Sequence, residues 1–290
     1  MKRRTDAAAG ASREPSGVPS AATVRPLPLD PRTLGSRLAG SPLVVLLDVD
    51  GTLAPIAPRP EDASVPAATR AAVAALARAR STHVALVSGR GAGDARRLVG
   101  VDGVWAIGNH GLETIDPDGI LSIDERVGAW ESALQSVRAR AAEAVASAPG
   151  ARVEDKGATL SVHYRLAEAG DVPRLEEAVA AAADRAGLRV TRGRKVIEVR
   201  PPIAVDKGTA VLALARRLGA TERSASIVFA GDDTTDEDAM EALRGWHADA
   251  VTIHVEGEDP RSTRAEFRAG SPAELGKWLA ALAAMRGGGD

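Results

Sequence analysis

Short apolar segments that end in polar residues constrain the fold of this 290-residue chain more than any other feature. Residues 43–47 form a continuous apolar, β-branched-rich run that ends at Asp48. Such a run is typical of a central parallel strand, which is buried on both faces. Similar runs are found at residues 83–87, 104–107, 226–230 and 250–255, and segments with helical spacing lie between or after them at 66–80, 93–99, 206–218, 236–244 and 272–285. This alternation predicts crossover units of a parallel sheet.

The alternation is interrupted between residues 124 and 201. Here the pattern predicts a helix, two short strands, a second helix and two more strands, at residues 128–147, 152–154, 159–163, 172–186, 188–192 and 195–199. This order is typical of helices packed over an antiparallel sheet. We therefore expect an α/β protein with a Rossmann-like parallel-sheet core, residues 37–123 and 202–290, and an inserted α+β cap domain with an antiparallel sheet and two helices, residues 124–201.

Residues 1–36 lack periodicity and are rich in proline, alanine, glycine and serine. We expect them to form a disordered tail. They contain no apolar centre of the 7 to 15 residues or so that a secretory signal requires. The apolar runs of the chain are also far shorter than the roughly 18 to 20 residues that span a bilayer. The sequence therefore predicts a cytoplasmic protein without a membrane partner.

Charge and cysteine content exclude several classes of function. The chain has 37 Lys and Arg against 39 Asp and Glu, so its formal net charge of −2 gives no electrostatic reason to expect nucleic acid. It contains no cysteine, which excludes disulfides, thiolate metal sites and cysteine nucleophiles. We expect a small-molecule partner and a metal site, if there is one, built from oxygen or imidazole ligands. Oligomeric state stays open, with a monomer as the default.

Two aspartates follow the first apolar run, in the segment Asp48-Val49-Asp50-Gly51-Thr52. Side chains at positions i and i+2 of an extended chain project to the same side, so both carboxylates can face one cleft. One can attack phosphorus and form an aspartyl-phosphate while the other handles a proton. Gly51 allows backbone amides to approach a phosphate, and Thr52 can donate a hydroxyl hydrogen bond. The alternative is a turn capped by carboxylates, which is common after strands.

Further polar residues follow other predicted strands. Ser88 ends the second run, Lys207 stands where the parallel-sheet pattern resumes, and an acidic cluster at 232–236 follows the run that ends at residue 230. Taken singly, these residues can be a helix cap, a solvated lysine and an acidic helix N-terminus. Carboxylates packed this closely are better explained by a hard cation between them. Together they predict a hydroxyl, a cation and metal ligands around one phosphate.

These segments resemble the motifs of haloacid dehalogenase-like phosphohydrolases. With the segments that precede and follow the insertion, and those inside it, they are similar to the trehalose-6-phosphate phosphatase family over residues 41–285. The motifs lie at residues 47–56, 87–90, 108–113, 154–157, 163–165, 198–201, 206–208 and 231–237. The resemblance implies Mg²⁺-dependent hydrolysis of trehalose 6-phosphate to trehalose and phosphate, the last step of trehalose biosynthesis.

The resemblance also implies a role for each matching residue. Asp48 is the expected nucleophile and Asp50 the acid that protonates the leaving oxygen and later activates water. The expected Mg²⁺ ligands are Asp48, Asp50 through its backbone carbonyl, and Asp232, supported by Asp233 and Asp236. The expected phosphate-binding residues are Gly51, Thr52, Ser88, Gly89 and Lys207. The expected substrate-binding residues are Asn109, His110, Glu113, Glu154, Lys156, Arg165 and Glu198.

Three other readings stay open at the level of sequence. A related sugar phosphatase acting on sucrose 6-phosphate or a mannosyl phosphoester would differ only in its cap contacts. A phosphomutase would use a similar aspartyl-phosphate but exclude water, and a non-catalytic sugar-phosphate sensor would not need Asp48 and Asp50. The polar residues of the insertion could also be a solvated sheet face with cross-strand salt bridges.

Overall fold

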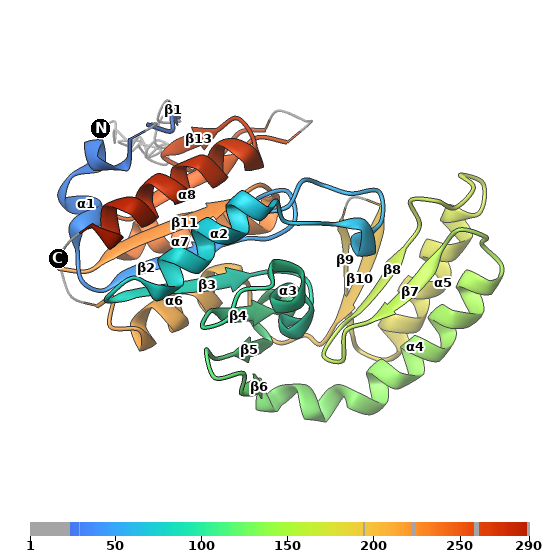
Figure 1. Ribbon diagram of the computed structural model, residues 1–290. Coiled ribbons are helices and arrows are strands. Elements are labelled where there is room, and N and C mark those ends of the chain that lie inside the picture. Colours follow the sequence, from blue (N-terminus) through green and yellow to red (C-terminus); the bar gives the residue numbers. More distant parts are fainter. Residues whose placement is uncertain (1–23, 29, 194, 222–223, 258–260, 289–290) are drawn as a thin grey trace, which may run out of the picture.

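The computed structural model describes residues 24–28, 30–193, 195–221, 224–257 and 261–288. Among these, nine strands form one sheet in the order β1-β13-β12-β11-β2-β3-β4-β5-β6 (Figure 1). Their bounds are β1 Arg25–Pro26, β2 Leu43–Leu47, β3 Thr82–Val87, β4 Trp105–Gly108, β5 Glu113–Ile115, β6 Leu121–Ile123, β11 Ser226–Gly231, β12 Val251–Val255 and β13 Phe267–Ala269. In this sheet order, all neighbouring strands from β1 across to β4 pair in parallel, and β5 and β6 extend the sheet beyond β4 with antiparallel pairs.

Helices cover both faces of this sheet, so its central strands are mostly apolar and β2 is entirely so. Leu43, Val45 and Leu47 of β2 pack in one cluster, whereas Val44 and Leu46 pack in the other. The first cluster includes helices α2 Ala67–Arg78, α3 Ala92–Val99 and α8 Pro272–Gly287. The second includes α6 Lys207–Arg217 and α7 Thr234–Trp246. The predicted parallel-sheet core is confirmed.

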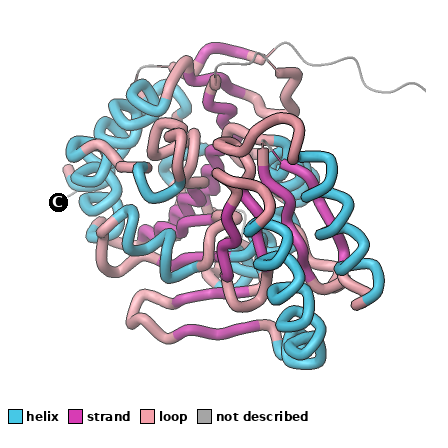
Figure 2. Tube along the Cα trace, turned by 90° about the vertical axis from the view of Figure 1, so that its right-hand side faces the viewer, coloured by secondary structure: helices cyan, strands magenta, loops and turns pink. Residues whose placement is uncertain are grey.

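A second sheet lies beside the core, in the order β7-β8-β10-β9, with all its pairs antiparallel (Figures 1 and 2). Its strands are β7 Arg152–Asp155, β8 Leu160–His163, β9 Arg189–Gly193 and β10 Val196–Arg200. Helices α4 Glu131–Ala146 and α5 Val172–Arg185 pack on one face, against residues such as Leu160, Val162, Ile197 and Val199. The alternate residues of each strand therefore leave a polar face toward the core, as the predicted α+β cap requires.

The structure differs from the predictions at the short elements. Within the expected tail, β1 pairs with β13, and the turn η1 Pro31–Leu34 contacts α8, so residues 24–28 and 30–36 are ordered parts of the core. The rest of that expected tail, residues 1–23, lies outside the described residues. The three-residue strands β5, β6 and β13 were not predicted, because segments this short rarely show a clear period. The remaining elements are short helical segments in the core and between the core and α4: α1 Ser36–Ala39, η2 Pro60–Asp62, η3 Asn109–Gly111 and η4 Glu125–Trp130. None of the helices described is both apolar and long enough to cross a bilayer.

Candidate active site

Three neighbouring strands bring the predicted chemistry to one edge of the sheet. Because β11, β2 and β3 are adjacent and parallel, the residues that follow them meet at their carboxyl ends. Asp48 follows β2, Ser88 follows β3 and Asp232 follows β11. Lys207 is the first residue of α6, whose preceding residue Asp206 caps the helix by accepting a 2.7 Å hydrogen bond from the Thr209 amide.

Lys207 connects two buried carboxylates. Its Nζ lies 2.8 Å from Asp48 Oδ1 and 2.8 Å from Asp236 Oδ1, and all three side chains are almost fully buried. Burial alone would lower the pKa of Lys207, but Asp236 and Asp48 outweigh it and raise that pKa well above its usual value. Burial, followed by the charge of Asp236, raises the pKa of Asp48 well above its usual value although Lys207 opposes the shift. The three groups form one coupled electrostatic unit.

Three carboxylates form the carboxylate cluster, which we define as Asp48, Asp232 and Asp236. Each offers an oxygen, and these oxygens lie within 4.8 Å of one another. Among the described residues Asp48 Oδ2 is buried without a hydrogen-bond partner. Burial, together with Asp236 and Asp233, raises the pKa of Asp232 to about 7. An all-oxygen donor set with an unsatisfied buried oxygen and mutual repulsion fits a hard divalent cation.

Asp233 lies at the start of helix α7 and outside the carboxylate cluster. Its Oδ1 accepts hydrogen bonds from the Thr235 amide at 2.6 Å and the Thr235 hydroxyl at 2.7 Å, so it caps helix α7. Asp236 Oδ2 accepts the amides of Asp232 and Asp233 at 3.0 Å each. The two aspartates form a capping box, and it is Asp236 rather than Asp233 that stands in the carboxylate cluster.

The loop after β2 passes very close to Asp232. Gly51 has a φ of +87°, and a Cβ there would lie 2.2 Å from Asp232 Oδ2, so both the conformation and the space require glycine. Thr52 is buried and donates from Oγ1 to Asp232 Oδ1 over 3.4 Å. Ser88 is also buried, and its Oγ accepts the Arg90 amide at 3.1 Å. A Cβ on Gly89 would lie 2.8 Å from the His110 ring, so this loop too has no room for a side chain.

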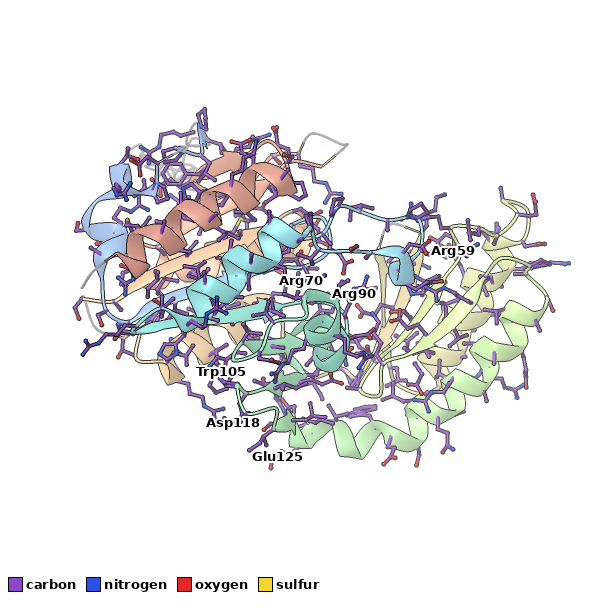
Figure 3. The ribbon with its side chains drawn as sticks, in the orientation of Figure 1. Arg59, Arg70, Arg90, Trp105, Asp118 and Glu125 are labelled. Carbon is purple, nitrogen blue, oxygen red and sulfur yellow. The ribbon has the colours of Figure 1, made fainter. Side chains whose placement is uncertain are left out.

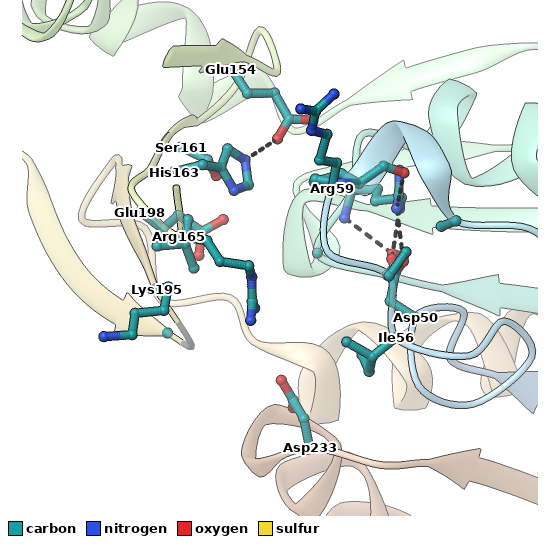
Figure 4. Close-up of a pocket in the computed structure, with 18 of the residues that line it drawn as sticks. Asp50, Ile56, Arg59, Glu154, Ser161, His163, Arg165, Lys195, Glu198 and Asp233 are labelled. Carbon is teal, nitrogen blue, oxygen red and sulfur yellow. Dashed lines mark hydrogen bonds and ion pairs between the residues drawn. The ribbon is translucent and has the colours of Figure 1, made fainter. Parts of the chain in front are cut away.

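Asp50 is held by an arginine that the sequence motif contained without a role. Arg90 Nε lies 2.6 Å from Asp50 Oδ2 and its Nη2 lies 2.7 Å from Oδ1, a bidentate pair (Figure 4). Nη2 also donates to the Pro60 carbonyl at 2.9 Å. Figure 3 shows Arg90 at the end of the core that faces the second sheet. The pair fixes the direction of the Asp50 carboxylate, and although Arg90 follows Ser88 and Gly89 directly, nothing in the sequence indicated its partner.

A cavity of about 890 Å³ lies between the strand ends and the polar face of the second sheet (Figure 4). The predicted site residues that line it are Asp48, Asp50, Ser88, Gly89, His110, Glu154, Lys156, Arg165, Glu198, Lys207, Asp232 and Asp233. Among the other residues that line it, to which the sequence assigned no role, are Arg59, Glu61, Arg90, Arg152, Ser161, His163, Arg192, Lys195 and Arg261. The charged residues of this group are cationic except Glu61, which suits an anionic ligand.

The polar face of the second sheet carries a row of paired side chains. Glu154, Ser161 and Glu198 lie opposite one another across β7, β8 and β10. His163 Nε2 lies 2.6 Å from Glu154 Oε2, and His110 Nε2 of the core lies 3.2 Å from Glu198 Oε2. Burial would raise the pKa of Glu198, but the hydrogen bond from His110 and the positive charges of His110, Lys156 and Arg200 together outweigh it and lower that pKa to about 2. For Glu154, too, burial would raise the pKa, but the His163 hydrogen bond and the charges of Lys156, His163 and Arg90 together outweigh it and lower that pKa. These carboxylates face the cavity as strong hydrogen-bond acceptors.

Asn109 and Glu113 were expected to contact substrate, and the structure places them elsewhere. Both are buried and neither is among the residues that line the cavity. Glu113 accepts hydrogen bonds from the Ala92 amide and the Asn109 side chain, and Asn109 reaches the loop between β7 and β8. These two residues lie behind the cavity wall, between the core and the second sheet.

Comparison with known proteins supports one family. The trehalose-phosphatase family model matches residues 46–272. A trehalose-phosphate phosphatase of Mycobacterium marinum is 39% identical over 244 residues, which are 83% of this chain and 61% of that protein. An uncharacterized glycosyl hydrolase of Mycobacterium tuberculosis is 41% identical over 249 residues, which are 85% of this chain and 18% of that protein. The chain thus spans less than two thirds of the length of these relatives.

A solved structure of a trehalose-6-phosphate phosphatase related protein is similar to this chain in three dimensions. The TM-score is 0.71 at 26% sequence identity, and the match covers 83% of this chain and 97% of that chain. The family model covers the strand ends, the carboxylate cluster and the second sheet. The chain belongs to the trehalose-phosphatase family.

Proposed function

We propose that this chain hydrolyses trehalose 6-phosphate to trehalose and phosphate with the help of Mg²⁺. The observation that carries the proposal is the group at the floor of the cavity. There Lys207 lies 2.8 Å from Asp48, whose second oxygen has no hydrogen-bond partner among the described residues. A carboxylate held on one oxygen by a buried cation and free on the other is suited to in-line attack on a phosphoryl group.

The proposed reaction has two halves. Asp48 Oδ2 attacks phosphorus, the bond between phosphorus and the sugar oxygen breaks, and Asp50, protonated after one of its oxygens has left the ion pair with Arg90, gives its proton to that oxygen. Asp50 then takes a proton from water, the resulting hydroxide attacks the aspartyl-phosphate on Asp48, and phosphate leaves with the Asp48 carboxylate restored. The donors available for the phosphoryl oxygens are Lys207 Nζ and the Ser88 hydroxyl, which both line the cavity.

Mg²⁺ fits the carboxylate cluster on the grounds given above. We propose Asp48, Asp232 and the Asp50 backbone carbonyl as its ligands, with Asp236 held beside them by Lys207 and the amides of α7. The ion supplies positive charge that neutralises the phosphoryl oxygens. In this proposal Asp233 acts through the N-terminus of α7, which it caps, and not as a ligand.

Recognition of the sugar belongs to the second sheet, which we propose as a cap domain of residues 124–201. Glu154, Lys156, Arg165 and Glu198 line the cavity opposite the nucleophile. Their carboxylates and cations can accept and donate hydrogen bonds to sugar hydroxyls. In Figure 4, Arg165 projects from this face toward the space between Asp50 and Asp233. His110 and His163 hold the two glutamates in place and are proposed here as part of the same surface.

The test is Mg²⁺-dependent phosphate release from trehalose 6-phosphate, sucrose 6-phosphate, glucose 6-phosphate and a mannosyl phosphoester. Asp48→Asn is the blank, and its thermal midpoint should match that of the wild type. We expect preference for trehalose 6-phosphate and no turnover by Asp48→Asn. Metal-dependent release with a preference for another substrate would support phosphatase activity but contradict trehalose 6-phosphate as the substrate. A fully active Asp48→Asn would contradict the role of Asp48 as nucleophile.

A further inference from the structure

Asn109 lies at the junction of the core and the second sheet with every hydrogen-bonding group of its amide in use. It begins the turn η3 after β4, is fully buried, and has a φ of +49°, a left-handed conformation that asparagine adopts more readily than most residues. Its Oδ1 accepts the Thr159 hydroxyl at 2.7 Å. Its Nδ2 donates to the Lys156 carbonyl at 3.0 Å and to Glu113 Oε1 at 2.6 Å. Two of these three bonds reach the loop between β7 and β8.

Glu113 fixes the orientation of that amide. Its second oxygen, Oε2, accepts the Ala92 amide at 2.9 Å, at the N-terminus of α3. A carboxylate is favoured there by the helix dipole and by an otherwise unpaired amide. With Glu113 as an acceptor, the Nδ2 of Asn109 must face Glu113 and Lys156, and its Oδ1 must face Thr159. The side-chain amide of Asn109 is therefore already oriented for both of its hydrogen bonds to the second sheet.

The loop that Asn109 holds carries a residue of the cavity wall. Lys156 donates from Nζ to the Gly89 carbonyl at 2.9 Å, over the loop that follows β3. The loop is tight, because Gly157 has a φ of +73° and its amide donates to Asp155 Oδ1 at 2.9 Å. In Figure 1 the loop joining β7 and β8 points toward the core. Because Asn109 holds the Lys156 carbonyl in place, the Lys156 ammonium group lies beside the loop that follows β3.

We propose that Asn109 and Thr159 form a latch that holds the β7–β8 loop against the core, and that Asn109 is a positioning residue rather than a sugar ligand. The latch works through Lys156 and deepens the proposed function, on which its kinetic part rests. Both partners are fully buried while they are joined. Removing one partner leaves the other as an unsatisfied buried group, which weakens the joined state relative to a separated state in which water reaches both.

The matched variants are Thr159→Val and Thr159→Ser. Valine keeps the shape of threonine and removes the hydroxyl, so Asn109 Oδ1 loses its donor, whereas serine keeps the donor. A saturating ligand draws the protein back to the joined state, so the loss appears in apparent affinity. For Thr159→Val we expect the KM for trehalose 6-phosphate to rise about tenfold with kcat within about twofold. With p-nitrophenyl phosphate, whose leaving group is small, kcat/KM should change less than about twofold, and Thr159→Ser should resemble the wild type on both substrates.

A second readout does not depend on the substrate. The chain contains no cysteine, so Glu61→Cys with Arg152→Cys introduces its only two thiols. The native side chains form an ion pair between the core and β7, with Arg152 Nη2 2.9 Å from Glu61 Oε2. In this background we expect a short bifunctional thiol reagent to join the two cysteines more slowly with Thr159→Val than with Thr159→Ser.

Each outcome decides something. Equal cross-linking in the valine and serine backgrounds would overturn the latch, and so would an unchanged KM in Thr159→Val. An equal loss on both substrates, or in both variants, would make Thr159 a structural residue. If the wild type releases no phosphate from trehalose 6-phosphate, the proposed function fails while cross-linking still tests the latch.

Discussion

Replacing Lys207 with methionine removes the ammonium group that is hydrogen-bonded to Asp48 and Asp236 but keeps an unbranched side chain of similar length. Lys207 is 3% exposed at its side chain, and its two partners are 6% and 0% exposed. Water therefore cannot replace the lost cation without opening the site. In the variant, the ammonium group of Lys207 no longer compensates the negative charges of Asp48, Asp236 and the neighbouring Asp232.

The expected cost follows from that burial. Breaking a buried ion pair by removing one partner destabilises a protein by about 3 to 5 kcal/mol. For a chain of this size, this loss corresponds to a fall of about 6 to 20 °C in the thermal midpoint. The loss depends on pH, because Lys207 opposes the raised pKa of Asp48 and its removal raises that pKa further. A carboxyl group whose folded pKa lies above its unfolded pKa stabilises the folded state at low pH, and this contribution disappears as pH rises through the folded value. The deficit should thus be larger at about pH 8 than at about pH 5.

The assay is the thermal midpoint at both pH values, with and without Mg²⁺, against Lys277→Met as the matched control. Lys277 is an exposed lysine of helix α8, so its replacement should change the midpoint little. Mg²⁺ should restore part of the stability of Lys207→Met, since it supplies a cation to the same carboxylates. A Lys207→Met protein as stable as Lys277→Met at both pH values would refute the electrostatic argument.

Two further predictions follow from the same site. Glu198→Ala should lower kcat/KM for trehalose 6-phosphate about 10- to 100-fold, because hydrogen bonds to a charged group are lost. The kcat/KM for p-nitrophenyl phosphate should change by less than about threefold. Equal losses on the two substrates would make Glu198 a structural residue. The pKa of Asp232 is raised to about 7 in the metal-free protein, so the increase in thermal midpoint on adding Mg²⁺ should grow from about pH 5.5 to about pH 8 as the ligands lose their protons. An increase that is independent of pH would contradict that assignment of ligands.

The long elements and the motif positions could be predicted because their signals are local. The strand β2 is five consecutive buried apolar residues followed by Asp48, and strands β3 and β11 each contain four consecutive buried apolar residues shortly before Ser88 and Asp232. Adjacent parallel strands place these residues at one edge. The capping box of Asp233 and Asp236 also had a local signal, since an aspartate three residues before another acid at the start of a helix is the pattern of that motif.

The contacts that join distant segments could not be predicted from the sequence. Arg90 and Asp50 are 40 residues apart, and Asn109 and Thr159 are 50 apart. A side chain that can donate or accept in many directions does not reveal its partner until the backbone places one within reach. For the same reason Asn109 and Glu113 resembled sugar ligands in the sequence and are buried supports in the structure.

The sequence alone determined the order of the longer strands and helices, the interruption of the sheet by the second α+β unit, and the identity of the acidic, basic and hydroxyl groups at the strand ends. Hydrophobic periodicity and strand direction are properties of short segments, and they suffice for those conclusions. The tertiary structure alone decided which carboxylates share a cation, which arginine holds Asp50, and which polar residues face the cavity instead of supporting its wall. These outcomes depend on distances of about 3 Å between segments far apart in the chain, and only the packed fold sets such distances.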